Sequence, residues 1–363
     1  MPKFQFYLPV ETDLTRIQRR AIDSREPIFL SGVPGTGKTV VSIKRLQNAA
    51  GLNKKGIIFT YGKLLKKTIE EKLENNPDMP VKNIHDWMWW DVQPRNGKQY
   101  LEVMTESNNI DSTVQMIKEK KLIFDEILVD EGQDLSINTY KILKELTSSL
   151  SISADNAQQI NNREEATNEE EILSIFPHII RFELDEVFRS PYEIYKFAIQ
   201  FVPNNARAND PTLLERLKRK NSGADKPYLY LENNLDGIYK SVKDIIDENP
   251  TDNIGILFEK IFYVDEFAKN LSEEYEVSTY HNQEVIPSEL KNIIITTFKS
   301  AKGIEFDIVI IPYFADAARN IDEEYYVGVT RAKNLVYFLA IKNTPLIIAS
   351  FDKDTYQIED NRG

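Results

Sequence analysis

The sequence predicts an α/β protein whose sheets are largely parallel. Short runs rich in β-branched residues alternate with amphipathic helical stretches, which is the pattern of βαβ units. The predicted strands are "PIFLSG", "GIIFTY", "EILVDE", "SLSISAD", "NIGILF", "NIIITTF", "FDIVIIPY" and "NLVYFLAI". The predicted helices are "TVVSIKRLQNAA", "KLLKKTIEEKL", "INTYKILKELTSSL" and "PYEIYKFAIQFV". Ligands of such folds bind beyond the carboxyl ends of strands, so the residues that follow each strand are candidate functional residues.

Two polar segments interrupt these elements. The acidic stretch "INNREEATNEEEILS" is typical of a loop that leads into a short helix. The stretch "VPNNARANDPTLLERLKRKNSGADKP" has the proline, glycine and asparagine content of exposed connections.

Composition excludes several classes of function. The 363 residues are enough for two domains, and the contents of 41% hydrophobic and 28% charged residues are ordinary for a globular protein. The absence of cysteine excludes disulfides, thiol catalysis and cysteine-ligated metals, and the three histidines have no metal-ligand spacing. A net charge of −12 argues against a general nucleic-acid coat protein but leaves room for a local basic groove.

The N-terminal stretch "MPKFQFYLPVETDLTR" lacks the basic and apolar regions of a signal peptide. No apolar run approaches the ~20 residues that span a bilayer. We therefore expect a cytoplasmic protein with no membrane partner.

A glycine-rich segment follows the strand "PIFLSG". Between that strand and a helix, the full P-loop pattern is formed by Gly32, Val33, Pro34, Gly35, Thr36, Gly37, Lys38 and Thr39. The glycines let backbone N–H groups turn toward the β- and γ-phosphates of a nucleotide, and the helix N-terminus adds a favourable field. Lys38 supplies a positive charge to those phosphates, and the Thr39 hydroxyl is a ligand for Mg²⁺. The motif predicts ATP and Mg²⁺ as ligands.

Three acids follow a second strand in "EILVDEGQDLS". Asp130, at the strand end, is expected to hold the same Mg²⁺ as Thr39. Glu131 is placed to orient and deprotonate the attacking water, so that hydrolysis proceeds by positioning and charge neutralisation. Asp134 can instead cap the helix that follows.

With further motifs in the same order, these residues resemble the UvrD/Rep-like branch of superfamily 1 helicases over about residues 14–340. The motifs are "LTRIQRRA", "GVPGTGKT", "IIFTYGKLL", "VDEGQD", "SADNAQQI", "LDEVFRS", "TTFKSAKGIEFDIVII" and "EEYYVGVTRAKNLVYF". The resemblance implies two RecA-like P-loop NTPase domains with parallel sheets and a nucleotide bound in the cleft between them. It implies an N-terminal domain over 1–180, with a small insertion at about 64–121, and a C-terminal domain over 181–363.

The resemblance also implies contacts with the nucleotide. Gln18 would read the adenine edge and Phe188 would stack on the base. Gly303 would lie near phosphate and Glu305 near the ribose.

The catalytic residues implied in this way are Lys38, Glu131, Gln158, Arg189 and Arg331. Gln158 would sense the γ-phosphate, Arg189 would contact it, and Arg331 would be an arginine finger worth ~10³–10⁵ in rate. Because both arginines fall in the second domain, hydrolysis would require the domains to close. Taken alone, each arginine is equally consistent with a surface salt bridge.

The candidate contacts with a nucleic-acid strand are Phe59, Thr60, His85, Trp87, Thr297 and Lys299. The segment "VKNIHDWMWWDVQPRNGKQY" holds all three tryptophans. Exposed aromatic side chains there would suit base stacking. The alternatives are a small buried core or a partner-docking patch, and the frequent burial of large aromatic side chains favours the core.

Departures from the family leave two functions open. Where the family has base-wedging aromatics, this chain has Asn161 and Arg163, and the large accessory insertions are reduced or absent. The first hypothesis is an ATP-driven motor (a helicase or translocase) on single-stranded nucleic acid, with DNA favoured over RNA. The alternative is a helicase-derived, ATP-gated switch that controls a protein partner such as a nuclease without unwinding on its own.

Overall fold

The computed structural model describes residues 2–92, 110–155, 167–281, 286–314 and 322–362. The chain forms two compact units. The N-terminal unit is Tyr7–Asp185, and the C-terminal unit is Glu186–Gly363 together with Met1–Phe6. The division therefore falls at 185/186, where the sequence suggested 180/181, and the first six residues join the second unit.

The N-terminal unit is built on a parallel sheet with the strand order β3-β2-β4-β5-β1-β6. Its strands are β1 (Ile28–Ser31), β2 (Gly56–Thr60), β3 (Val81–Asn83), β4 (Glu126–Asp130), β5 (Leu150–Ala154) and β6 (Ile180–Glu183). Its helices are η1 (Glu11–Asp13), α1 (Arg16–Asp23), α2 (Lys38–Gly51), α3 (Lys63–Lys72), α4 (Ile84–Asp86), η2 (Trp87–Val92), α6 (Ile110–Glu119), η4 (Gly132–Asp134), α7 (Ile137–Lys144) and α8 (Glu169–Ile175). The predicted parallel α/β architecture is confirmed.

The central strands of this unit are apolar on both faces. One face packs against α2, where Val41 contacts Ile28 and Leu30. The other face packs against side chains that include Trp87 and Tyr140. A strand covered on both sides reads as a continuous apolar run, which explains why the four central strands were visible in the sequence.

The strand register brings the ends of β1, β4 and β5 together. Ser31 is paired with Ala154, and Val129 with Ile152. Since all these strands are parallel, the segments that follow them emerge at the same edge of the sheet. The site described below lies at this edge.

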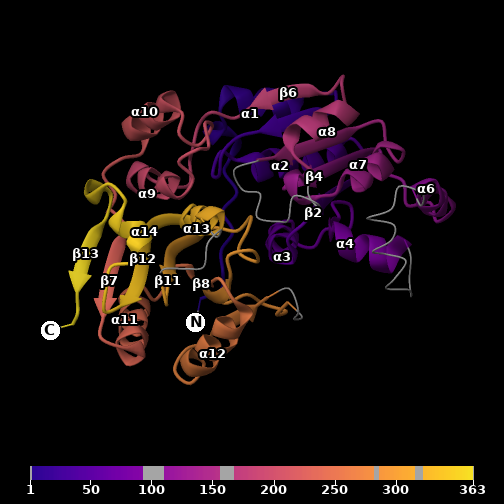
Figure 1. The fold of residues 1–363 in the computed structure, drawn as a ribbon. Helices are drawn as coiled ribbons and strands as arrows, with labels where there is room; N and C mark the ends of the chain where they lie inside the picture. Colours follow the sequence, from indigo (N-terminus) through magenta and orange to yellow (C-terminus); the bar gives the residue numbers. More distant parts are fainter. Residues whose placement is uncertain (1, 93–109, 156–166, 282–285, 315–321, 363) are drawn as a thin grey trace. The chain divides into compact units, whose positions relative to one another are not determined.

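The C-terminal unit has a second parallel sheet, with the order β13-β7-β12-β11-β8-β10-β9. Its strands are β7 (Tyr228–Glu232), β8 (Ile254–Phe258), β9 (Ser278–Tyr280), β10 (Ile293–Thr297), β11 (Phe306–Ile311), β12 (Ala332–Ile341) and β13 (Gln357–Asp360). Its helices are α9 (Tyr192–Ala198), η6 (Ile199–Phe201), α10 (Pro211–Lys220), α11 (Leu235–Glu248), α12 (Ile261–Leu271), α13 (Asp322–Val329), α14 (Leu346–Ala349) and η7 (Lys353–Thr355). Helices α11 and α12 cover one face of the sheet, and α9 lies on the other (Figure 1).

Two sequence predictions about helices were wrong in part. The segment predicted as an exposed connection contains α10, which begins at the N-cap Asp210 with Pro211 as its first residue. Leu213 and Leu217, one turn apart, bury its apolar face. The helix predicted over "INTYKILKELTSSL" ends at Lys144, and its last residue already belongs to β5.

The first residues of the chain are part of the C-terminal unit. The Phe4 N–H donates to the Leu290 carbonyl at 2.9 Å, and the Asn292 N–H donates to the Pro2 carbonyl at 3.1 Å. Gln5 exchanges two hydrogen bonds with the Asn253 side chain, at 3.1 and 3.0 Å. Residues 2–6, which we call the N-terminal strap, thus complete the ends of β8 and β10.

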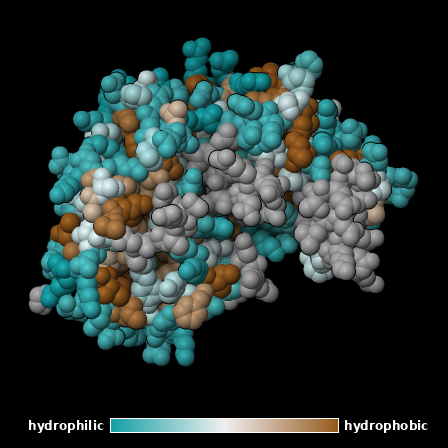
Figure 2. Space-filling model, viewed as in Figure 1, coloured by the Kyte–Doolittle hydropathy of each residue, from teal (hydrophilic) through white to brown (hydrophobic). Residues whose placement is uncertain are grey.

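Hydrophilic side chains dominate the face of the molecule seen in Figure 2. Among the described residues, no helix combines the length and the apolar character needed to cross a membrane.

Candidate active site

The loop between β1 and α2 has the backbone shape that its glycines predict. Gly35 and Gly37 adopt φ angles of 77° and 87°, a backbone region that residues other than glycine rarely occupy. A Cβ on Gly37 would also lie 2.5 Å from the Gln18 Nε2 atom. The loop therefore depends on glycine both for its backbone conformation and for the close approach of Gln18.

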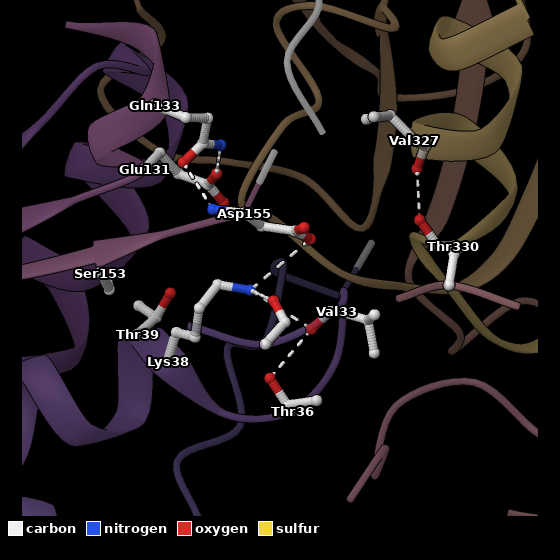
Figure 3. Close-up of polar contacts among 12 residues, drawn as sticks. Val33, Thr36, Lys38, Thr39, Glu131, Gln133, Ser153, Asp155, Val327 and Thr330 are labelled. Atoms are coloured by element: carbon white, nitrogen blue, oxygen red, sulfur yellow. Dashed lines mark hydrogen bonds and ion pairs between the residues drawn. The ribbon is translucent and has the colours of Figure 1, made fainter. Parts of the chain in front are cut away.

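Lys38 lies over this loop and is buried. Its Nζ donates to the carbonyls of Gly32 and Val33, at 2.6 and 3.2 Å, and lies 3.8 Å from the Asp155 carboxylate (Figure 3). Thr36 donates from its hydroxyl to the Val33 carbonyl at 2.9 Å. The ammonium group is thus held against the loop by two carbonyls, and its role toward phosphate stays a prediction.

Gln18 ties α1 to the loop. Its Nε2 donates to the Thr36 carbonyl at 2.9 Å, and its Oε1 accepts from the Thr15 N–H at 2.8 Å as part of a capping box. The side chain is buried and uses both ends of its amide within the N-terminal unit. The structure thus places Gln18 beside the P-loop, and its role toward adenine stays a prediction.

Thr39 and Asp130 meet as the sequence predicted. The Thr39 hydroxyl donates to Asp130 Oδ2 at 2.7 Å, and Ser153 donates to the other carboxylate oxygen. Burial and the neighbouring Glu131 carboxylate raise the pKa of Asp130, while the two hydroxyls and the Lys38 charge oppose that shift. A raised pKa means that the environment disfavours the charged carboxylate, so a cation bound beside Asp130 would stabilise its charged form.

The donor set fits Mg²⁺. Thr39 and Asp130 offer a hydroxyl and a carboxylate oxygen, which are hard ligands, and Mg²⁺ commonly takes only one or two protein ligands beside phosphate oxygens and water. The described residues contain no cluster of three or more acidic, histidine or cysteine ligands that would form an all-protein metal cage. The site therefore suits a cation that arrives together with a nucleotide.

Glu131 follows Asp130 in a strained conformation. Its φ of 58° lies in the left-handed region, which is uncommon for a residue with a Cβ and often marks a functional position. Its Oε2 accepts from Gln133 Nε2 at 2.7 Å (Figure 3). The turn that follows is held by the Tyr140 hydroxyl, which donates to the Gly132 carbonyl at 2.6 Å.

In the C-terminal unit, Arg189 and Glu305 form an ion pair. Arg189 Nη2 lies 2.5 Å from Glu305 Oε1, and Nη1 donates to the Thr330 carbonyl at 3.2 Å. Burial alone would raise the pKa of Glu305, but Arg189 and other nearby cations reverse that effect and leave it lowered. The Arg189 Nε is buried and has no hydrogen-bond partner among the described residues, which suits a guanidinium that binds a further anion.

The other predicted residues of this unit take varied positions. Arg331, between α13 and β12, is buried, and its Nε donates to the Val327 carbonyl at 3.0 Å. Phe188 is 47% exposed, so its ring is open to a planar ligand. Gly303 is buried with a φ of 87°. Gln158, which belongs to the sequence range of the N-terminal unit, lies outside the described residues.

Residues 18–162 match the model of a family described as AAA domain. The matched range holds the P-loop and both acids after β4, so this part of the chain is similar to an AAA domain. None of the curated proteins compared with the chain matches it. Among solved structures, the C-terminal domain of a possible DNA helicase from Lactobacillus plantarum WCFS1 is similar, with 17% identity over 47% of this chain and 98% of that one and a TM-score of 0.38.

Two aromatic candidates for nucleic-acid contact, Phe59 and Trp87, lie in the core of the N-terminal unit. Phe59 and Trp87 are buried against each other, with ring centroids 4.8 Å apart, and Thr60 is 1% exposed. His85 is half-buried against Tyr61, and burial is the main cause of its lowered pKa. Trp90, by contrast, is 67% exposed. The buried-core interpretation of Trp87 is confirmed.

The candidates in the C-terminal unit differ in the same way. Thr297, at the end of β10, is buried and donates to the Ser300 hydroxyl at 3.1 Å. The Lys299 side chain is 51% exposed and lies 3.6 Å from Glu324. Lys299 is the more accessible of the two.

Sequence reasoning missed three polar residues of the site in the N-terminal unit. Ser153 donates to Asp130, Asp155 pairs with Lys38, and Gln133 bonds Glu131. All three stand in motifs that the sequence already marked. The contact of Ser153 with Asp130 depends on the pairing of β4 with β5, and the contact of Asp155 with Lys38 depends on the pairing of β1 with β5.

Proposed function

We propose that the protein is an ATP-hydrolysing motor on single-stranded nucleic acid, of the UvrD/Rep-like type in superfamily 1. The observation that carries this proposal is the meeting of Lys38, the Thr39–Asp130 pair and Glu131 at one edge of the sheet. A structural glycine turn would not need a buried lysine, a hydroxyl–carboxylate pair and a strained acid together.

In this proposal the P-loop binds the phosphates of ATP. Lys38 exchanges its bonds to the Gly32 and Val33 carbonyls for phosphate oxygens, and backbone N–H groups at the start of α2 support them. Thr39 and Asp130 would hold Mg²⁺, which supplies charge neutralisation at the transferred phosphoryl group. Phe188 and Glu305 are assigned to the base and the ribose.

Glu131 acts on the attacking water. Its carboxylate orients the water and accepts a proton as the water oxygen attacks the γ-phosphorus, while the bond to the bridging oxygen breaks and ADP leaves. Arg189 and Arg331 neutralise charge on the phosphoryl group, with Gln158 assigned as sensor. Since both arginines belong to the C-terminal unit, hydrolysis depends on the two units acting together.

A second function is favoured by the burial of the aromatic candidates. Phe59 and Trp87 are 0% and 2% exposed, and buried rings cannot stack on bases without unpacking the core. Stacking contributes ~1–3 kcal/mol per base in single-strand binders. We therefore retain an ATP-gated switch, which uses the same hydrolysis to control a protein partner such as a nuclease.

The ATPase rate with and without single-stranded DNA, single-stranded RNA and duplex tests both functions. The motor requires single strands to stimulate turnover, and Lys38→Ala must abolish the basal and the stimulated rates. A basal rate that Lys38→Ala abolishes but that no nucleic acid changes would reject the motor and support the switch. An absence of ATPase activity in the unmutated protein under all conditions would reject both.

A further inference from the structure

Gln133 occupies an unusual position for a polar side chain. It lies in η4, two residues after Glu131, and is 0% exposed. A buried amide is costly unless both of its ends are hydrogen-bonded. Both ends of Gln133 are hydrogen-bonded, and its two partners belong to different segments of the N-terminal unit.

The first partner is the acid assigned to the attacking water. Gln133 Nε2 donates to Glu131 Oε2 at 2.7 Å (Figure 3). The Glu131 backbone is left-handed, so its side chain direction is set by a turn that the helix α7 and the sheet hold in place. The amide of Gln133 therefore fixes one oxygen of the Glu131 carboxylate.

The second partner belongs to the segment after β5. Gln133 Oε1 accepts from the Asp155 N–H at 3.0 Å. The Asp155 carboxylate in turn lies 3.8 Å from Lys38 Nζ, and Asp155 is fully buried. Two hydrogen bonds and one ion pair thus connect Glu131, Gln133, Asp155 and Lys38 in that order.

We propose that Gln133 is a positioning residue for ATP hydrolysis, which holds the Glu131 carboxylate and the Asp155 backbone in one fixed arrangement. This inference rests on the proposed ATPase function. Gln133 takes no proton and forms no covalent bond; the proton of the attacking water passes to Glu131. When Lys38 leaves the loop carbonyls for a phosphate, its contact with Asp155 changes, and Gln133 carries that change to the acid that orients the water.

The geometry requires a side chain that donates at one end and accepts at the other, and the amide of Gln133 does both. Methionine has a similar length and offers neither function. Glutamate keeps the acceptor for the Asp155 N–H but presents a carboxylate to the Glu131 carboxylate. Gln133→Met therefore removes both hydrogen bonds, whereas Gln133→Glu removes only the bond to Glu131.

The test compares Gln133→Met, Gln133→Glu and the control Thr68→Val by steady-state ATPase kinetics and equilibrium ATP binding. Thr68 is also buried in the N-terminal unit, and its hydroxyl donates to the Leu65 carbonyl in α3 at 2.9 Å. We expect both Gln133 variants to lose ~10²-fold in kcat, the size of effect that a misplaced catalytic group produces. The dissociation constant of ATP should stay within about twofold, and Thr68→Val should match the unmutated protein.

A double-mutant cycle with Glu131→Gln separates positioning from general destabilisation. If Gln133 acts through Glu131, Gln133→Met costs less than about twofold in single-turnover rate once Glu131 is already replaced. A full additional loss in that background, an unchanged kcat in Gln133→Met, or a fall in ATP affinity alone would each overturn the proposal while the ATPase function stands. A loss of folding in Gln133→Met leaves Gln133→Glu, which keeps the Asp155 bond, to decide by the same criteria. An unmutated protein that hydrolyses no ATP would instead reject the function and, with it, this role of Gln133.

Discussion

Replacing Phe4 with alanine tests whether the N-terminal strap stabilises the C-terminal unit. The Phe4 ring is 9% exposed and packs edge-on against Phe306, with centroids 5.9 Å apart and planes at 73°. Truncation of a buried phenylalanine typically costs about 3–5 kcal/mol. Because Phe4 lies at the end of the sheet, where the cavity can partly collapse, we expect a loss of about 3 kcal/mol.

Urea unfolding can assign this loss to one unit, because all three tryptophans of the chain lie in the N-terminal unit. Tryptophan fluorescence therefore follows that unit, whereas far-ultraviolet circular dichroism follows both. With a slope of about 2 kcal/mol per molar urea, a loss of about 3 kcal/mol lowers the midpoint of the C-terminal unit by about 1.5 M. The control is Tyr7→Ala, at the first residue beyond the strap, whose side chain is 63% exposed.

Three results would refute this reasoning. The circular dichroism transition of Phe4→Ala could stay within about 0.3 M of the unmutated protein, a shift well below the one expected from the burial of the ring. Tyr7→Ala could shift the transition as much as Phe4→Ala does. The fluorescence transition could move alone, which would place the effect of Phe4 in the wrong unit.

Four further predictions concern the site and its surroundings. Glu131→Gln should still bind ATP but lose hydrolysis, which equilibrium binding and phosphate release measure; near-normal turnover would remove Glu131 from its role. Tyr140→Phe leaves the buried Gly132 carbonyl without its donor and should lower the unfolding free energy of the N-terminal unit by about 1–3 kcal/mol, followed by fluorescence. The pKa of Glu305 is lowered from an ordinary value of 4.5, so its ion pair stabilises the C-terminal unit above pH 4.5 and the effect fades as the pH falls through the folded value. Glu305→Gln should therefore be less stable at pH 7, with a difference that shrinks as the pH falls below 4.5, and a difference that stays constant in acid would contradict this. Trp90→Ala should weaken single-strand affinity ~10–100-fold if the exposed ring stacks on a base, and an unchanged affinity would exclude that contact.

Most inner strands could be predicted from the sequence, but the edge strands and the partly exposed inner strand β7 could not. Strands such as β4 and β11 are buried on both faces, so each appears as a continuous apolar run. The edge strand β6 is mostly exposed and β3 is only three residues long, so neither has a recognisable pattern of apolar residues in the sequence. The helix α10 was missed because its proline and asparagine neighbours suggested a connection, although Pro211 at the first turn is a helix start signal.

Some residues of the site could likewise be predicted from the sequence, and others could not. The P-loop is one continuous segment whose function depends on local backbone shape, so its residues could be named from the sequence alone. The contacts of Gln133 with Asp155 and of Ser153 with Asp130 depend on β5 lying beside β4. Twenty residues or more separate these partners, and no local pattern reports which strands pair.

The choice between a motor and a switch depends on surfaces rather than on the ATP site. Lys38, Thr39 and Asp130 would serve either function in the same way, because both need a bound and hydrolysed nucleotide. A motor must in addition grip a strand, and the grip is carried by exposed aromatic and basic side chains. In the tryptophan-containing segment, Trp87 packs in the core against Phe59, whereas Trp90 is exposed to solvent. Among the described residues of this segment, Trp90 is therefore the most exposed aromatic side chain. It lies three residues beyond Trp87, and its response to substitution separates the two functions.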